Sequence, residues 1–338
     1  MIYPKFLKEG MTIGIPAPSN GASDEQRIAR HKNSKKTFED LGFNVVQSKN
    51  INNSYKHRSA DKFERAEEIN EMFKSKDIDY MLCASGGEFL VEILPYIDFD
   101  LLVNNPKFVH GFSDPTGLLF PITTKYDIAT IYGTNAGEFG MENWHQNVKN
   151  SFEIMKGNLV EQQSFEKYAS GWKEYITGLE GYNLDKENIW KTLDGKDVKV
   201  KGRLIGGCFE LISALSGTKY DGMKEFNERY KDDGIILFLD NCQTSFIDTI
   251  ITLWRFNELD YFKYAKAVVF GRFGMETPDD DYQSVKECLE GSILKDLNIP
   301  IIYDADISHK DPCMTIINGA IGEIEVKDGK GIIRQKLK

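Results

Sequence analysis

One serine in this chain has the setting of a catalytic nucleophile. Ser113 follows the apolar run Lys107–Gly111 and precedes Asp114 and Pro115. Proline favours the first turn of a helix, so the pattern predicts a strand that ends at a glycine and a helix that starts just after the serine. Such a turn residue lies at the edge of a sheet, beside backbone N–H groups that the new helix leaves free. A serine in this position can attack a carbonyl carbon, which indicates acyl transfer or amide hydrolysis.

A serine hydroxyl needs a neighbouring base, and imidazole is the usual one. His309 is the candidate, because it lies in the polar loop Asp304–Pro312 directly after a short apolar run, and catalytic side chains often gather on such loops. A solvated loop histidine is equally compatible with the pattern. The other four histidines are predicted to be packing or solvent-exposed residues: His31, His57, His110 and His145.

The acid that would orient the imidazole is predicted at Asp240, the last residue of the apolar run Gly234–Asp240. A carboxylate at the end of a buried strand is well placed to face a site. It would serve equally well as the N-cap of the helix that follows, and the pattern leaves both roles open.

Two glycines supply the candidate oxyanion hole. Gly86 and Gly87 follow a buried apolar run, and glycine lets a substrate approach the backbone closely. We expect the N–H groups of Gly87 and Asp114 to bind the oxyanion and Gly86 to contact substrate. A simple tight turn is the alternative interpretation of the glycine pair.

These candidates need a sheet to position them, and the first half of the chain predicts one. Short strands are expected at 11–16, 43–47, 78–84, 107–111 and 128–133, with helices opened by Ser23 and Ser59 and a further helix near 143–157. Alternating strands and helices are typical of a parallel sheet covered by helices.

The second half is expected to contain more sheet than helix. Apolar runs at 199–207, 234–240, 267–271, 299–304 and 331–337 predict its strands. The predicted fold class is therefore α/β, with an N-terminal parallel-sheet α/β domain over 1–157 and a smaller, sheet-rich mixed C-terminal domain over 197–338. Residues 158–196, which are polar, aromatic and weakly periodic, are interpreted as a linker or inserted region.

Composition limits the partners of the chain. The formal charge is −10, from 52 acidic and 42 basic side chains, which disfavours nucleic acid and anionic membranes and favours a small molecule or short peptide as substrate. Five scattered cysteines without a C-x-x-C pair predict neither disulfides nor a zinc site, as expected of a cytoplasmic protein. The apolar runs are too short for a signal peptide or a membrane span, and we expect no metal and no cofactor.

Five blocks of sequence, in order, resemble the LD-carboxypeptidase family of serine peptidases and, within it, the microcin C immunity peptidase branch. The blocks are 84–102, 107–119, 201–218, 234–242 and 298–320. The resemblance implies that Ser113 is the nucleophile, that His309 is the base and that the residue at 240 orients it. The family has glutamate at this last position, and the shorter Asp240 must reach the imidazole by a small shift of the backbone. The resemblance also implies a cleft between two domains, and a homodimer.

The family offers two substrate classes. The microcin-type enzymes cleave the amide between an aminoacyl group and a nucleotide-like moiety, and the murein enzymes remove the terminal D-residue of a tetrapeptide. Trp172 and Trp190, in the aromatic segment 158–196, would favour the first class if they stack on a base; packing is the alternative.

Three other classes of protein remain to be weighed. A homologue that binds its ligand without turnover is compatible with Asp240. A metal hydrolase would use Thr277–Asp281 or the pair Asp304 and Asp306, although acidic runs are usually solvated. An ordinary α/β-hydrolase is disfavoured, because Gly111–Pro115 does not match G-x-S-x-G.

Overall fold

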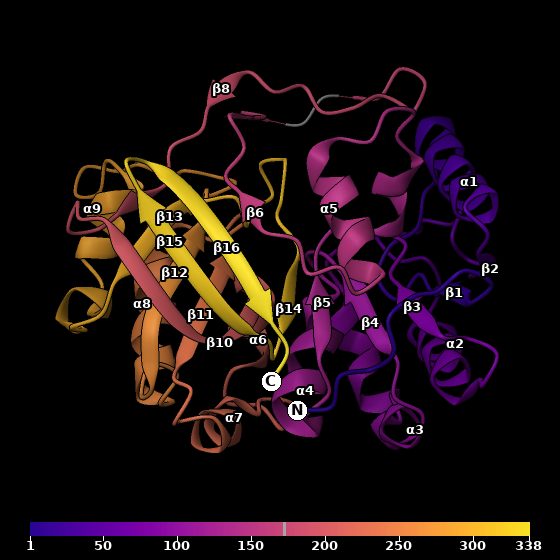
Figure 1. Cartoon of the computed structure of the whole chain (residues 1–338), viewed down its shortest axis with the longest axis horizontal. Coiled ribbons are helices and arrows are strands. Elements are labelled where there is room, and N and C mark those ends of the chain that lie inside the picture. The colour runs from indigo at the N-terminus through magenta and orange to yellow at the C-terminus, as the bar shows by residue number, and fades with distance from the viewer. Residues whose placement is uncertain (172–173) are drawn as a thin grey trace.

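The computed structural model describes residues 1–171 and 174–338, which build two large sheets lying side by side (Figure 1). The first sheet has six strands in the order β14-β5-β4-β3-β1-β2, and the pairs among β1 to β5 are parallel. Its strands are β1 (Thr12–Ile15), β2 (Asn44–Gln47), β3 (Tyr80–Leu82), β4 (Phe108–Gly111), β5 (Thr130–Tyr132) and β14 (Ile316–Asn318). The predicted N-terminal parallel sheet is confirmed.

Helices connect these strands, as the alternating pattern predicts. They are α1 (Glu25–Asp40), α2 (Lys62–Lys74), η1 (Leu90–Tyr96), α3 (Phe99–Asn104), α4 (Thr116–Tyr126), η2 (Ala136–Gly140) and α5 (Gln146–Met155). Their expected starting points at Ser23 and Ser59 are wrong by one and two residues. Asp24 and Asp61 are the N-caps, because each carboxylate accepts hydrogen bonds from first-turn N–H groups.

The second sheet has eight strands in the order β6-β16-β15-β10-β11-β12-β13-β9. Its centre, β10 to β13, is parallel, and antiparallel strands flank it on both sides. The bounds are β6 (Gln162–Gln163), β9 (Lys191–Thr192), β10 (Val198–Cys208), β11 (Ile235–Asp240), β12 (Ala265–Gly271), β13 (Ile301–Ala305), β15 (Ile321–Lys327) and β16 (Lys330–Lys336). The second half of the chain is thus rich in sheet, as predicted.

Smaller elements complete the second half. The helices are α6 (Phe209–Leu215), α7 (Met223–Arg229), α8 (Phe246–Glu258), α9 (Val285–Glu290) and η3 (Ile293–Asp296), and β7 (Lys167–Tyr168) pairs with β8 (Lys186–Glu187). One apolar core runs without interruption from α2 and α4 to β11 and β12. A second core covers the other side of the six-stranded sheet. The two halves are therefore joined by buried apolar contacts.

The chain crosses between the halves late in the sequence. After β13 it leaves the second sheet, and β14 pairs antiparallel with β5 of the first sheet, with Ile316 opposite Tyr132. It then returns as β15 and β16, so β14 lies between β5 and β10 (Figure 1). The loop between β13 and β14 consequently lies where the two sheets meet. None of the helices within 1–171 and 174–338 combines the length and apolar character needed to span a bilayer.

Candidate active site

Ser113 occupies the turn between β4 and α4, where the sequence predicts it. Its φ of 70° is in the left-handed region, which a residue with a side chain rarely adopts. The amide of Thr116 donates to the Ser113 carbonyl (2.9 Å), and this bond closes the first turn of the helix. Such strain is concentrated at functional sites, because the surrounding structure must hold it in place.

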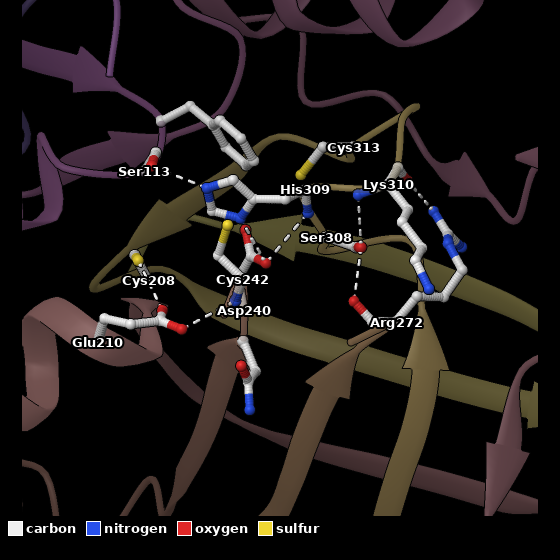
Figure 2. A network of polar contacts seen from close by, with 12 residues as sticks. Ser113, Cys208, Glu210, Asp240, Cys242, Arg272, Ser308, His309, Lys310 and Cys313 are labelled. Atoms are coloured by element: carbon white, nitrogen blue, oxygen red, sulfur yellow. Dashed lines mark hydrogen bonds and ion pairs between the residues drawn. The ribbon is translucent and has the colours of Figure 1, made fainter. Parts of the chain in front are cut away.

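Ser113, His309 and Asp240 lie in one chain of contacts, although 196 positions separate the serine from the histidine (Figure 2). His309 Nε2 is 2.7 Å from Ser113 Oγ, and His309 Nδ1 is 2.9 Å from Asp240 Oδ1. The serine comes from the end of β4, the aspartate from the end of β11 and the histidine from the loop after β13. This geometry matches a nucleophile, a base and an orienting acid.

The shorter aspartate reaches the histidine because the loop approaches it closely. Asp240 is fully buried, and its Oδ1 also accepts a hydrogen bond from the backbone N–H of His309 (3.1 Å). Two contacts to one residue fix the imidazole relative to the carboxylate. The departure from the family glutamate therefore does not break the contact.

Tyr132 is a site residue that the sequence did not reveal. Its hydroxyl donates to Asp240 Oδ2 (2.6 Å), so both oxygens of the carboxylate have partners. In the sequence Tyr132 is an ordinary aromatic residue at the end of an apolar strand. Only the pairing of β5 with β4, which places Tyr132 opposite Gly111, brings it to the serine turn.

Burial and a neighbouring carboxylate have opposite effects on the pKa of the His309 imidazole. Burial lowers the pKa of His309, whereas the Asp240 carboxylate raises it, and the net pKa lies well above its usual value. The same carboxylate would stabilise the imidazolium that forms when His309 takes a proton from serine.

Gly86 lies beside Ser113, and Gly87 lies beside Ser19. A Cβ added to Gly86 would be 3.1 Å from Ser113 Cβ and 3.3 Å from Ser113 Oγ. Gly87 has φ +152°, and a Cβ there would collide with the hydroxyl of Ser19. Within the part of the chain that the structure describes, the N–H groups of Gly87 and Asp114 donate no hydrogen bond. Their role as an oxyanion hole stays a prediction.

The Asp114 side chain has a separate, structural role. Its buried carboxylate accepts hydrogen bonds from the Ser19 hydroxyl and from the N–H of Leu90 (2.9 Å). These contacts tie the start of α4 to the loops after β1 and β3. Asp114 thus anchors the turn that carries Ser113.

The remaining histidines lie outside this chain of contacts. Burial lowers the pKa of His31 to about 4 and that of His110 to about 3, so both are neutral packing residues. His145 is the N-cap of α5, and His57 is exposed on a loop.

The aromatic residues predicted to bind substrate have a different outcome. Trp172 lies outside the described residues. Trp190 is 1% exposed, packs in the core and donates its indole N–H to Asp306 (2.9 Å). The predicted role of Trp190 as an open stacking surface is therefore wrong, because no face of its ring is available.

The acidic residues weighed as metal ligands have protein partners instead. Asp306 pairs with Arg272, and Asp304 pairs with Lys191 (2.9 Å). Asp279 accepts hydrogen bonds from the N–H groups of Asp281 and Tyr282 in a turn. Among the described residues, no group of three or more histidine, cysteine, aspartate or glutamate side chains is arranged to hold a metal ion.

Comparison with known proteins matches both halves of the chain. The family model described as the LD-carboxypeptidase N-terminal domain matches residues 13–133, and the model of the LD-carboxypeptidase C-terminal domain matches 201–324. A putative carboxypeptidase of Vibrio cholerae is 26% identical over 96% of this chain and 95% of its own length. The microcin C7 self-immunity protein MccF of Escherichia coli is 28% identical over 81% of this chain and 79% of its own length.

Solved structures support the same fold. MccF in complex with aspartyl sulfamoyl adenosine superposes with a TM-score of 0.80 at 24% identity, covering all of both chains. A muramoyltetrapeptide carboxypeptidase from Oxalobacter formigenes superposes with a TM-score of 0.72 at 20% identity, covering 96% of this chain and 98% of that one. These superpositions establish the architecture of the chain.

Proposed function

Because the chain belongs to the LD-carboxypeptidase family, we propose that it is a serine peptidase of the microcin immunity type, which cleaves the amide of an aminoacyl-nucleotide or of a short peptide. The observation that carries the proposal is the continuous contact from Ser113 Oγ through His309 to Asp240. The family models, which cover both halves of the chain, support hydrolase chemistry.

In the proposed mechanism Ser113 Oγ attacks the carbonyl carbon of the scissile amide. His309 Nε2 accepts the hydroxyl proton, and Asp240 holds the ring and stabilises its positive charge. The N–H groups of Gly87 and Asp114 donate to the oxyanion of the tetrahedral intermediate. His309 then protonates the leaving amine, and water releases the acyl group by the reverse sequence of proton transfers.

A second substrate class is supported by relatives of another kind. The murein tetrapeptide carboxypeptidase of Pseudomonas aeruginosa is 21% identical over 79% of this chain. A murein tetrapeptide is therefore the alternative substrate. We favour the aminoacyl-nucleotide, because the chain is more similar to MccF, at 28% identity, than to this murein enzyme.

Mass spectrometry of the purified protein with each substrate separates the possibilities. We expect cleavage of an aminoacyl sulfamoyl adenosine and none by the Ser113→Ala variant. Cleavage of murein tetrapeptide alone would assign the other branch. If neither compound is cleaved and a fluorophosphonate does not label Ser113, the chain is a binding homologue rather than an enzyme.

The proposal includes a homodimer, as the resemblance implies, and a cytoplasmic location, as the scattered cysteines predict. A light-scattering mass equal to two chains of 38.5 kDa would support the dimer. A mass of one chain at micromolar concentration would contradict it.

A further inference from the structure

Arg272 is a buried residue, outside the triad, that holds the loop carrying His309. It follows β12 directly, and its side chain is 4% exposed. Its Nη1 donates to Asp306 Oδ1 (2.6 Å), three residues before the histidine. Its Nη2 donates to the carbonyls of Lys310 (2.8 Å) and Pro312 (3.2 Å), which follow the histidine. The guanidinium therefore contacts the loop on both sides of His309 in the sequence. Figure 2 shows its contact with Lys310.

The backbone of Arg272 holds the same loop. Its carbonyl accepts the Ser308 hydroxyl (2.7 Å), and that hydroxyl in turn accepts the N–H of Lys310 (2.9 Å). Its N–H donates to the carbonyl of Ala305 (3.2 Å). Arg272 therefore makes hydrogen bonds to five residues of the loop, on both sides of His309: Ala305, Asp306, Ser308, Lys310 and Pro312.

The Asp306 carboxylate, which belongs to this loop, has further partners besides Arg272. Its carboxylate accepts hydrogen bonds from the Phe165 N–H (3.1 Å), the Asn188 amide and the Trp190 indole (2.9 Å). These three donors belong to the segment 158–196. The Arg272–Asp306 pair therefore connects that segment to the catalytic loop.

We propose that Arg272 is a positioning residue that holds His309 at proton-transfer distance from Ser113. The proposal rests on the proposed function for its effect on turnover. Lysine is not equivalent to arginine here, because all its donors lie on one nitrogen, whereas the contacts of Arg272 to Asp306 and to the two carbonyls come from two nitrogens held apart by the planar guanidinium. Small errors in the placement of a catalytic group cost large factors in rate.

The test compares Arg272→Lys with Arg203→Lys. Arg203 is a matched control: its side chain is 3% exposed, pairs with Asp233 and donates to the Gly319 carbonyl, outside the site. We expect the rate of fluorophosphonate labelling at Ser113 to fall about a hundredfold in Arg272→Lys. The rate in Arg203→Lys should stay within about threefold of wild type, since misplacement of the loop is absent there. Circular dichroism establishes that both variants are folded.

If Arg272→Lys does not fold, Ser308→Ala is a milder change, which removes only the hydroxyl between the Arg272 carbonyl and the Lys310 N–H. Labelling should then fall about tenfold. Labelling of the folded Arg272 variant, or of Ser308→Ala in its place, at the wild-type rate would overturn the positioning role and leave the proposed function intact.

Failure of the proposed function is recognised separately, because wild-type protein would then not be labelled. In that case the proton NMR signal of the His309 ring N–H that faces Asp240 decides the inference. We expect this low-field signal in wild type and in Arg203→Lys, and its loss or displacement in Arg272→Lys or Ser308→Ala. An unchanged signal would refute the positioning role.

Discussion

At the scale of single residues, the site depends on how one carboxylate is used. Asp240 is fully buried and has three donors around it: the His309 ring, the His309 backbone N–H and the Tyr132 hydroxyl. A buried carboxylate with this many partners is fixed in orientation. It can therefore set both the position and the basicity of His309.

Asp240→Asn tests this control of basicity. Catalysis needs the neutral imidazole, so the kcat/KM of the wild type should rise with pH through the raised pKa of His309. Without the carboxylate the largest remaining effect is burial, which lowers the pKa of His309, so the acid limb should move to lower pH. The maximal rate should fall by roughly 10³ to 10⁴, because the imidazole loses its orientation. A pH profile whose acid limb stays in place would contradict the role of Asp240.

At the scale of elements, the turns after β3 and β4 must pack against each other without side chains between them. Gly86 meets this need, since its missing Cβ leaves room beside Ser113. Glycine at such a position permits close approach rather than an unusual φ.

Gly86→Ala should therefore impair turnover more than folding. Its Cβ would lie 3.3 Å from Ser113 Oγ and displace the nucleophile. We expect kcat to fall by about tenfold to a hundredfold and the free energy of unfolding to change by less than about 1 kcal/mol. Gly181→Ala is the control, because a Cβ there meets nothing within 4 Å. Equal rates for the two variants would show that Gly86 does not border the nucleophile.

The sequence predicts the parallel strands of both sheets and several of the helices. Its pattern offers Ser113, Asp240 and His309 as candidates, because each lies at or after the end of an apolar strand, but their roles come from the resemblance to the family. The sequence does not reveal Tyr132 or Arg272. Both are buried, and the partner of a buried polar group depends on which strands become neighbours. The predicted stacking role of Trp190 is wrong for the same reason. Its polar segment suggests an exposed indole, whereas in the fold the indole is buried and its N–H donates to Asp306.

At the scale of the whole molecule, buried neutral histidines link stability to pH. His110 lies in β4 of the first sheet, with its Nδ1 3.0 Å from the Tyr80 hydroxyl, and burial lowers its pKa to about 3. The unfolded chain, with a histidine pKa of about 6.5, binds more protons between these values. Stability contributed by His110 is therefore full near neutral pH and is lost as the pH falls.

His110→Gln measures this contribution. Lowering the pH from about 7 to 5 should cost the wild type about 2 kcal/mol through His110, an increment that the variant lacks. Urea denaturation at the two pH values gives the difference, with His57→Gln as an exposed control that keeps the wild-type behaviour. Identical pH dependence in the wild type and His110→Gln would mean that His110 binds a proton as readily in the folded protein as in the unfolded chain.

The crossing of β14 into the first sheet has a practical consequence for dissecting this molecule. A fragment that stops near residue 157 would lose this strand and leave β5 with bare N–H and C=O groups along an open edge, which invites self-association. Cutting the chain in the middle would thus yield two aggregation-prone fragments instead of two independently folded domains. Recovery of activity on mixing such pieces would require the late strand to find its place in the early sheet.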